Sequence, residues 1–356
     1  MTDQANHRLP FAAQAAEKLG VALYDYMIGN ARDNAAGADV NEEAFSSYQL
    51  MPRVMRGQKS MDITRSFFGK TLSAPLIAGA FAGDRVFHED GLLPIARACR
   101  ALDLPLIISE ETVTPLATIC AEHEMSWLQL RAAGPLDRIR RLIDLAAGVG
   151  AQGIVLTVLA PVHPVAGMQP GGFSIGDELL RRGWPTIGST SAGVEALAPF
   201  PGWDWSDLKS ACDHAQSTGL PVLVKGILNA DDAEIAISTG CAGIVASNIG
   251  ARQSSRWVPA LDQLTDIRAK TNRPLIHDGG LRYGADVVTA LSLGADLAII
   301  VRPLICALVA GGEEAVTDVL RRLSDETLAI ANWCGVSSLD ELRPSFVSRR
   351  YGGLLP

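Results

Sequence analysis

Residues 275–303 read LIHDGGLRYGADVVTALSLGADLAIIVRP, and this stretch decides the fold. It opens with a short apolar run at Leu275–Asp278, passes through a helical pattern at Tyr283–Leu293, and closes with a second apolar run at Leu297–Val301. Both runs are apolar at consecutive positions, which is typical of parallel strands that helices cover. Residues 275–303 therefore predict a strand–helix–strand unit whose two strands run in the same direction.

The same alternation of apolar run and helical pattern repeats from about residue 75 onward. Eight such units in one direction predict an α/β fold, the (β/α)8 or TIM barrel. A doubly wound open sheet is the alternative, but it needs a glycine-rich first turn, and the sequence has no GxGxxG after a strand and no GxxxxGK[ST]. The predicted strands are Pro75–Ala78, Leu106–Ser109, Trp127–Leu130, Ile154–Val158, Val222–Lys225, Gly243–Ala246, Leu275–Asp278 and Leu297–Val301.

Two segments lie outside this repeat. Residues 1–70 form a helical and irregular extension, with a helix over Phe11–Asn34 and a small strand near Met61–Arg65, before the barrel of residues 71–356. A loop of about residues 160–205, rich in Gly, Pro, Ser and Trp, separates the fourth and fifth strands. A loop at this place in a barrel lies over the active site, so we expect a lid. A surface insertion is the alternative.

The composition of the chain argues against several classes of protein. The chain has 31 Lys+Arg against 39 Asp+Glu, for a net charge of -8, which argues against a general nucleic-acid binder. No stretch is long and apolar enough for a membrane span, and the first residues lack the apolar core of a secretory signal. The six cysteines form no CxxC pair, which indicates reduced thiols in a cytoplasmic protein without a metal site.

Polar residues follow the ends of the predicted strands, where the catalytic groups of a barrel lie. The loops after the seventh and eighth strands pair glycines at Gly279 and Gly280 with the cations Arg282 and Arg302. Glycine lets the backbone approach a ligand closely and arginine suits phosphate, so these loops predict a phosphate-binding site. A plain glycine turn is the alternative.

At this point the chain resembles the family of FMN-dependent α-hydroxy acid oxidases and dehydrogenases, which includes glycolate oxidase, lactate oxidase and mandelate dehydrogenase. The resemblance covers nearly the whole chain. It rests on Tyr24-Asp25-Tyr26, Phe45, Pro52-Arg53, Trp127–Leu130, Leu156–Val158, Val224–Ile227, Ser247–Gln253, Asp278–Arg282, Leu291–Ala295 and Arg302-Pro303.

The resemblance implies an FMN site and, by analogy with the family, a homotetramer. Lys225 would stabilise the negative charge that develops at N1 and O2 of the flavin on reduction. Asp278 would meet the ribityl chain. The other implied contacts are Ala80 and Ala82 through the backbone, Ser109, Gln129 and Thr157 at the ring edge, and Gly280, Arg282, Val301 and Arg302 at the phosphate.

The sequence departs from the family where substrate chemistry is expected. The family's histidine base corresponds to Ile249, which can neither accept nor donate a proton. The aspartate that orients this histidine corresponds to Leu159, the arginine that binds the substrate carboxylate to about Ala166, and a tyrosine to Arg131. Of the substrate-contacting set, Tyr26 and Arg252 remain.

New charged residues stand near the same place. Arg131 and Arg252 would clamp a carboxylate and Glu111 would bind an ammonium group, which suits a zwitterion. His163, early in the long loop, is a further candidate substrate contact. In the alternative interpretation, Glu110 pairs with Arg131 and Glu111 points to solvent.

These patterns predict an FMN-dependent oxidoreductase with altered substrate chemistry. Lys225, Tyr26 and Arg252 would serve the transfer of hydride from a small carboxylate- or amine-bearing substrate to FMN, with C–N oxidation favoured and O2 or another acceptor reoxidising the flavin. A non-redox, isomerase-like enzyme using reduced FMN and a non-catalytic flavin-binding protein are alternatives. A relocated base at His163 or His277 is a further one, although His277 fits a buried strand residue better.

Overall fold

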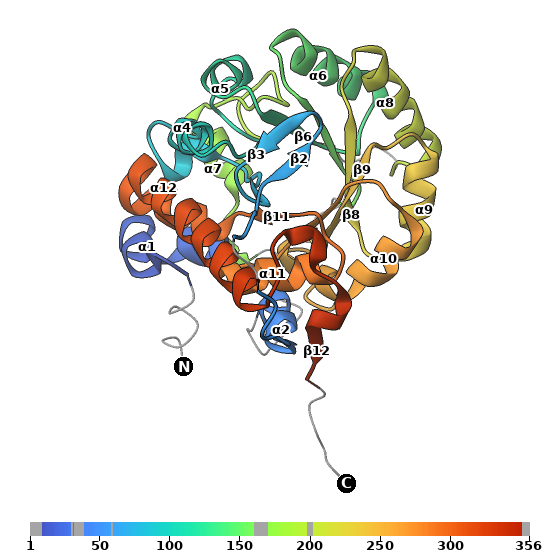
Figure 1. Cartoon of the computed structure of the whole chain (residues 1–356). Helices are drawn as coiled ribbons and strands as arrows, with labels where there is room; N and C mark the ends of the chain where they lie inside the picture. Colours follow the sequence, from blue (N-terminus) through green and yellow to red (C-terminus); the bar gives the residue numbers. More distant parts are fainter. Residues whose placement is uncertain are drawn as a thin grey trace.

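The computed structural model of the chain describes residues 9–29, 31, 39–57, 60–159, 170–197 and 202–350. Its centre is a closed barrel of eight parallel strands surrounded by helices, which confirms the predicted fold (Figure 1). The strands in chain order are β4 (Leu76–Ala78), β5 (Leu106–Ser109), β6 (Ser126–Arg131), β7 (Gly153–Thr157), β8 (Val222–Ile227), β9 (Gly243–Ser247), β10 (Leu275–Asp278) and β11 (Leu297–Ile300). Strand β11 pairs with β4 and closes the ring.

The strands are apolar on both faces because each face packs against a different layer. One row of side chains forms a cluster within the barrel, and it includes Ile77, Val155, Leu223, Val245 and Ile276. The alternate row packs against the surrounding helices. Burying one such aliphatic side chain stabilises the fold by about 1.5–3 kcal/mol, so the barrel wall supplies much of the stability that holds the strand ends in place.

Helices follow the strands and cover the outside of the barrel. Local capping explains several of the boundaries: the side chain of Asn229 accepts a hydrogen bond at the start of α9, and Asp204 and Asp207 form a capping box at the start of α8. The covering helices are α4 (Leu93–Ala101), α5 (Leu116–Glu122), α6 (Leu136–Gly148), α8 (Trp205–Ser217), α9 (Ala230–Ser238), α10 (Leu264–Lys270), α11 (Gly284–Ser292) and α12 (Arg302–Trp333).

The segment before the barrel differs in detail from the prediction. Helix α1 (Ala12–Ile28) ends before Gly29, six residues short of the predicted end at Asn34, and residues 30 and 32–34 lie outside the described residues. Gly20 interrupts its helical backbone. The predicted strand near Met61–Arg65 begins instead at Arg65, as the hairpin of β2 (Arg65–Phe67) and β3 (Lys70–Leu72).

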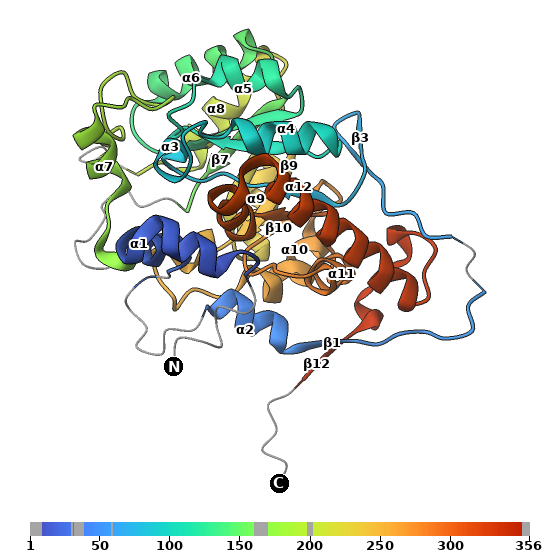
Figure 2. The same cartoon turned by 90° about the vertical axis from the view of Figure 1, so that its left-hand side faces the viewer.

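Further elements join the two ends of the chain to the barrel. Strand β1 (Tyr48–Leu50) pairs antiparallel with β12 (Val347–Arg349). Figure 2 shows α1 on the side of the barrel opposite to the β2–β3 hairpin. The remaining short elements are α2 (Val40–Ser46), α3 (Asp84–Phe87), η3 (Ile249–Ala251), η4 (Ala260–Gln263), η5 (Leu339–Glu341) and η6 (Pro344–Phe346).

The predicted lid is partly helical. Its described parts are residues 170–197 and 202–205. The first contains η2 (Pro170–Gly172) and α7 (Ile175–Arg182), whose first turn is capped by the side chain of Ser174. Phe173 packs against the ring of Tyr26 with 5.4 Å between ring centroids. Phe173 therefore faces the barrel mouth. Residues 160–169 and 198–201 lie outside the described residues.

Candidate functional site

A cavity of about 870 Å³ opens at the carboxyl ends of the barrel strands. Its lining comes from strand ends, from α1, from the turn after β9 and from the described part of the lid. Of the predicted site residues, His163 lies outside the described residues. The others all line this cavity: Tyr26, Ala80, Ala82, Ser109, Glu111, Gln129, Arg131, Thr157, Lys225, Arg252, Asp278, Gly280, Arg282, Val301 and Arg302.

Lys225 and Asp278 form an ion pair on the wall of the cavity. Lys225 Nζ also donates a hydrogen bond to Ser247 Oγ at 2.8 Å, and Ser247 Oγ donates to Asp278 Oδ2 at 2.7 Å. Burial raises the pKa of Asp278, but the charge of Lys225 and these hydrogen bonds outweigh burial and bring the pKa below its ordinary value. The three strands β8, β9 and β10 thus hold an oriented ammonium group.

Neutral hydrogen-bonding groups stand on the neighbouring strands. Gln129 Nε2 donates to Thr157 Oγ1 at 2.8 Å between β6 and β7. Ser109 Oγ, at the end of β5, accepts a hydrogen bond from the backbone N–H of Glu111 at 3.1 Å. These contacts fix the orientation of an amide and two hydroxyl groups on the wall of the cavity.

Two arginines form the other end of the cavity beside the turn that follows β10. Gly280 has φ +78 and needs to be glycine, because a Cβ there would lie 2.6 Å from the backbone of Asn41. Arg282 Nη1 donates to Leu281 O at 2.8 Å, and Arg302 Nη2 donates to Gly29 O and Gly250 O, both at 3.2 Å. Backbone carbonyls thereby fix both guanidinium groups.

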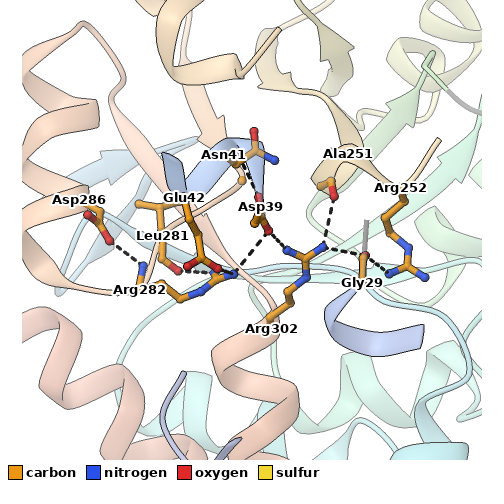
Figure 3. A network of polar contacts seen from close by, with 12 residues as sticks. Gly29, Asp39, Asn41, Glu42, Ala251, Arg252, Leu281, Arg282, Asp286 and Arg302 are labelled. Carbon is orange, nitrogen blue, oxygen red and sulfur yellow. Dashed lines mark hydrogen bonds and ion pairs between the residues drawn. The ribbon is translucent and has the colours of Figure 1, made fainter. Parts of the chain in front are cut away.

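The sequence interpretation missed the acidic partners of these arginines. Glu42 Oε1 accepts a hydrogen bond from Arg282 Nη2 at 2.6 Å, and Asp39 pairs with Arg302 (Figure 3). Burial raises the pKa of Asp39, but Arg302 and Arg282 bring it below its ordinary value. The partners in these two pairs are 240 and 263 residues apart in the sequence. Patterns over short stretches of sequence therefore could not predict the pairs.

Tyr26 and Arg252 form a second polar group at the mouth. The guanidinium carbon of Arg252 lies 4.4 Å from the centre of the Tyr26 ring, and Arg252 Nη1 donates to the backbone O of Tyr26 at 2.8 Å. Burial raises the pKa of Tyr26, while Arg252 lowers it, and the net pKa is above the ordinary value. Tyr26 is therefore a neutral phenol at pH 7, and Arg252 beside it is a fixed cation.

Glu110 is a buried carboxylate between two arginines. Its Oε1 accepts from Arg131 Nε at 2.5 Å and its Oε2 accepts from Arg138 Nη2 at 2.5 Å. Arg131 Nη2 donates further to Glu195 O at 3.1 Å, in the lid. The pairing of Glu110 with Arg131, which the sequence left as the alternative to a substrate clamp, is therefore present. Arg138 is a partner that the sequence interpretation did not single out.

Glu111 faces the cavity and pairs with Arg131. Its carboxylate is 3.3 Å from Arg131 Nη1, and its side chain is 21% exposed within the cavity. Burial raises the pKa of Glu111 above its ordinary value, and Glu110 adds to that rise against the opposing charges of Arg131 and Arg252. The alternative that Glu111 points to bulk solvent is wrong.

Ile249 lines the cavity where the family resemblance places a histidine. It lies in the turn η3 with φ 54. Leu159 follows β7, and its backbone O accepts a hydrogen bond from Gln253 Nε2 at 3.2 Å. Among the residues that the structure describes, no histidine lines the cavity. Ala166, the third departure from the family, lies outside the described residues.

His277 is a buried strand residue and does not line the cavity. Its ring packs edge-on against Phe45, with 5.5 Å between centroids, and its Nε2 is 2.9 Å from Gly279 O. Burial lowers the pKa of His277 to about 4, so the ring is neutral at pH 7. The hypothesis of a relocated base at His277 is therefore not supported by its position.

Within the described ranges, no group of three or more His, Cys, Asp or Glu side chains is arranged to hold a metal ion. No helix in the same ranges has the length and apolar character needed to cross a membrane.

Comparison with known proteins shows likeness over nearly the full chain. The model of a family described as FMN-dependent dehydrogenase matches residues 15–349. 2-Hydroxyacid oxidase 1 of Homo sapiens is 30% identical over 355 residues, covering 93% of this chain and 94% of the relative. 4-Hydroxymandelate oxidase of Amycolatopsis orientalis is 29% identical, covering 92% and 94%. A solved structure of a mandelate oxidase variant with (S)-mandelic acid is 28% identical, with a TM-score of 0.82 over 96% of this chain and 98% of that chain.

Proposed function

The chain belongs to the FMN-dependent dehydrogenase family, and on this premise we propose that it oxidises a C–N bond of a small carboxylate- or amine-bearing substrate. It is an FMN-dependent oxidoreductase, as its relatives are. The names of those relatives describe the oxidation of α-hydroxy acids. The amine substrate is inferred from one observation: Ile249 stands in the cavity where a base is needed for hydroxy acids.

The cavity and its donors fit FMN. Its volume of about 870 Å³ lies in the usual range of cofactor sites. Arg282 Nε is buried without a hydrogen-bond partner, so the guanidinium retains a donor for a phosphate oxygen. We assign the ring end to Ala80, Ala82, Ser109, Gln129, Thr157 and Lys225, the ribityl chain to Asp278, and the phosphate to Gly280, Arg282, Val301 and Arg302.

The residues of the chain prepare the site for hydride transfer. When bound, FMN would supply a two-electron acceptor for the substrate hydride, and O2 or another acceptor would reoxidise it. Lys225 supplies positive charge where negative charge develops on the ring, and Asp278 with Ser247 holds the ammonium group in place. Arg252 presents its guanidinium to a substrate carboxylate beside the neutral phenol of Tyr26.

An amine makes a smaller demand on a base than a hydroxyl does. The carbon of a neutral amine loses hydride while the nitrogen lone pair forms the C=N bond, and water can then hydrolyse the iminium product. An α-hydroxy acid must also lose its hydroxyl proton to a base, and Ile249 cannot accept it. Glu111, beside Arg131 in the cavity, would bind the ammonium form of the substrate before it loses a proton.

The visible spectrum of the purified holoprotein without oxygen tests this proposal. We expect amines or amino acids to bleach the flavin band and glycolate, lactate and mandelate to leave it unchanged. Bleaching by hydroxy acids alone would return the enzyme to the chemistry of its relatives. A flavin that no compound in either panel bleaches would favour the isomerase-like or non-catalytic alternatives and contradict the proposal.

A histidine at position 249 provides a second test. We expect Ile249→His to leave glycolate, lactate and mandelate unoxidised. Leu159 cannot orient the new ring, and Ala166 has no charged group to bind the carboxylate of the substrate. The measurement is the rate of flavin reduction by each acid, with Ile249→Gln as a polar control of similar length. A large gain with histidine alone would show that the pocket otherwise suits hydroxy acids.

We also propose that the enzyme is a cytoplasmic homotetramer. The family resemblance supports the assembly. All six cysteines are free thiols, as expected in a reducing compartment.

A further inference from the structure

Two carboxylates at the start of α2 face the arginines of the proposed phosphate site. The side chain of Asp39 caps α2 by accepting a hydrogen bond from Asn41 N at 2.9 Å. The same carboxylate pairs with Arg302 and lies 3.9 Å from Arg282 Nη2, while Glu42 meets that nitrogen at 2.6 Å. Figure 3 shows the two acids and the two arginines in one network.

These four charges are shielded from water. The exposed fractions of the side chains are 12% for Asp39, 20% for Glu42, 5% for Arg282 and 11% for Arg302. Two carboxylates and two guanidinium groups neutralise one another there. A phosphate brings almost two further negative charges to the same guanidinium groups, in surroundings where solvent screens charge poorly.

The start of α2 is also held against the turn that would bind the phosphate. The backbone of Asn41 lies against Gly280, and Asn41 Nδ2 donates to Asn248 Oδ1 at 3.0 Å after β9. Helix α2 therefore carries its carboxylates on a fixed support. Arg282 Nε, buried and without a partner, shows that the network of carboxylates leaves a donor unused beside the cavity.

We propose that Asp39 and Glu42 are an internal counter-anion that competes with the FMN phosphate for Arg282 and Arg302, and so reduces the preference of this chain for FMN over riboflavin. The inference rests on the placement of the phosphate in the proposed function. Riboflavin lacks the phosphate but shares the ring and the ribityl chain, so its binding is insensitive to this competition. The two acids thus set cofactor affinity without touching the reacting ring.

Cofactor exchange in the holoprotein tests the competition. The protein is dialysed against mixtures of FMN and riboflavin, and the bound flavins are separated and quantified. The variant Asp39→Asn/Glu42→Gln keeps the helix cap, because asparagine caps as well as aspartate, and removes both charges. We expect its FMN-to-riboflavin ratio to rise by about tenfold or more over wild type, where tenfold corresponds to about 1.4 kcal/mol. Glu43→Gln, an exposed change in the same turn, is the matched control and leaves the ratio unchanged.

Thermal unfolding separates competition from a merely structural role. Without flavin, the double variant leaves Arg282 and Arg302 without their carboxylate partners, so we expect its melting temperature to fall while the rise caused by added FMN grows. An unchanged or lower FMN-to-riboflavin ratio in a folded double variant would overturn the proposal. If the double variant does not fold, Glu42→Gln alone gives the same two readouts at Arg282.

Removal of an arginine distinguishes the placement of the phosphate from the competition of Asp39 and Glu42 with it. Arg302→Gln should abolish most of the preference for FMN if the phosphate lies there. A variant that keeps the preference would refute the placement and with it the competition. Loss of preference in Arg302→Gln together with no gain in the double variant would leave the placement intact and refute the competition alone.

Discussion

Lys225 and Ile249 give the cavity wall a charged group at one point and an apolar group at another. Lys225 is paired with Asp278 and hydrogen-bonded to Ser247, so its charge has a fixed direction. Ile249, in the turn after the neighbouring strand, offers an apolar surface and no proton acceptor. The charge that would stabilise a reduced flavin is therefore present, and the base that would activate a hydroxyl is absent at this position.

Replacement of Lys225 tests the charge at the ring. We expect Lys225→Met to lower the flavin reduction potential by about 30–60 mV, since 30 mV corresponds to about 1.4 kcal/mol for a two-electron couple. Turnover should fall with it, and Lys225→Arg should recover part of the potential. The potential is measured by spectroscopic titration against reference dyes. Equal potentials for wild type and Lys225→Met would refute the role of Lys225.

At the scale of elements, Glu110 links β5, β6 and α6. It follows β5 directly, Arg131 ends β6, and Arg138 lies in the first turn of α6. The side chain of Glu110 is 1% exposed, so both ion pairs are shielded from solvent. This arrangement makes Arg131 a structural cation first, and leaves it at the cavity wall with a fixed orientation.

Neutralising Glu110 should destabilise the barrel mouth. Glu110→Gln leaves Arg138 without its carboxylate and leaves Arg131 with Glu111 alone. Breaking a buried pair of this kind costs about 3–5 kcal/mol. The free energy of unfolding in urea measures the loss. Asp213→Asn removes the exposed pair with Lys209 on α8, and should cost about 0.3–0.5 kcal/mol. Similar losses of unfolding free energy in both variants would show that the Glu110 ion pairs stabilise the protein no more than an exposed pair does.

The lid shows what local patterns predict and what they miss. Its abundance of Gly, Pro and Ser predicted an irregular loop, yet Ile175–Arg182 is helical. Ser174 before the helix and Asp177 and Glu178 in its first turn are helix-start signals that the sequence does contain. A search for capping residues inside the loop would have located α7.

At the scale of the whole molecule, stability responds to acid through buried groups. His277 is held neutral by burial, with its pKa lowered from 6.5 to about 4. The unfolded chain binds a proton at this residue between pH 6.5 and pH 4, whereas the folded chain does not. Unfolding is therefore favoured progressively as the pH falls through this range.

Removal of His277 should flatten this dependence. The shift from 6.5 to about 4 corresponds to about 3 kcal/mol of stability lost by wild type over that range. In His277→Gln we expect the pH-dependent loss to be smaller by about this amount, whatever the variant's stability at pH 7. Urea unfolding at several pH values measures it, with His214→Gln on the surface of α8 as the control. The same slope in His277→Gln and wild type would contradict the assignment.

Much of the site could be predicted from the sequence, because the carboxyl ends of the strands in a barrel meet at one face. Ser109, Gln129, Thr157, Lys225 and Asp278 each end a strand or stand within it at that end, so counting strands brought them to one face. Long-range ion pairs had no such guide. Glu42 meets Arg282 across 240 residues, and Glu110 meets Arg138 across 28, at distances that no period in the sequence encodes.

The sequence by itself determined the barrel, the strand ends that line its cavity, and the loss of a titratable group at Ile249, because hydrophobic periodicity and residue identity are local properties. Only the tertiary structure decided which charges are already neutralised. It paired Arg131 with Glu110, Arg302 with Asp39 and Arg282 with Glu42. Such pairing depends on the packing of distant segments into a weakly screened interior, where the nearest opposite charge, and not the neighbour in sequence, sets the state of each group.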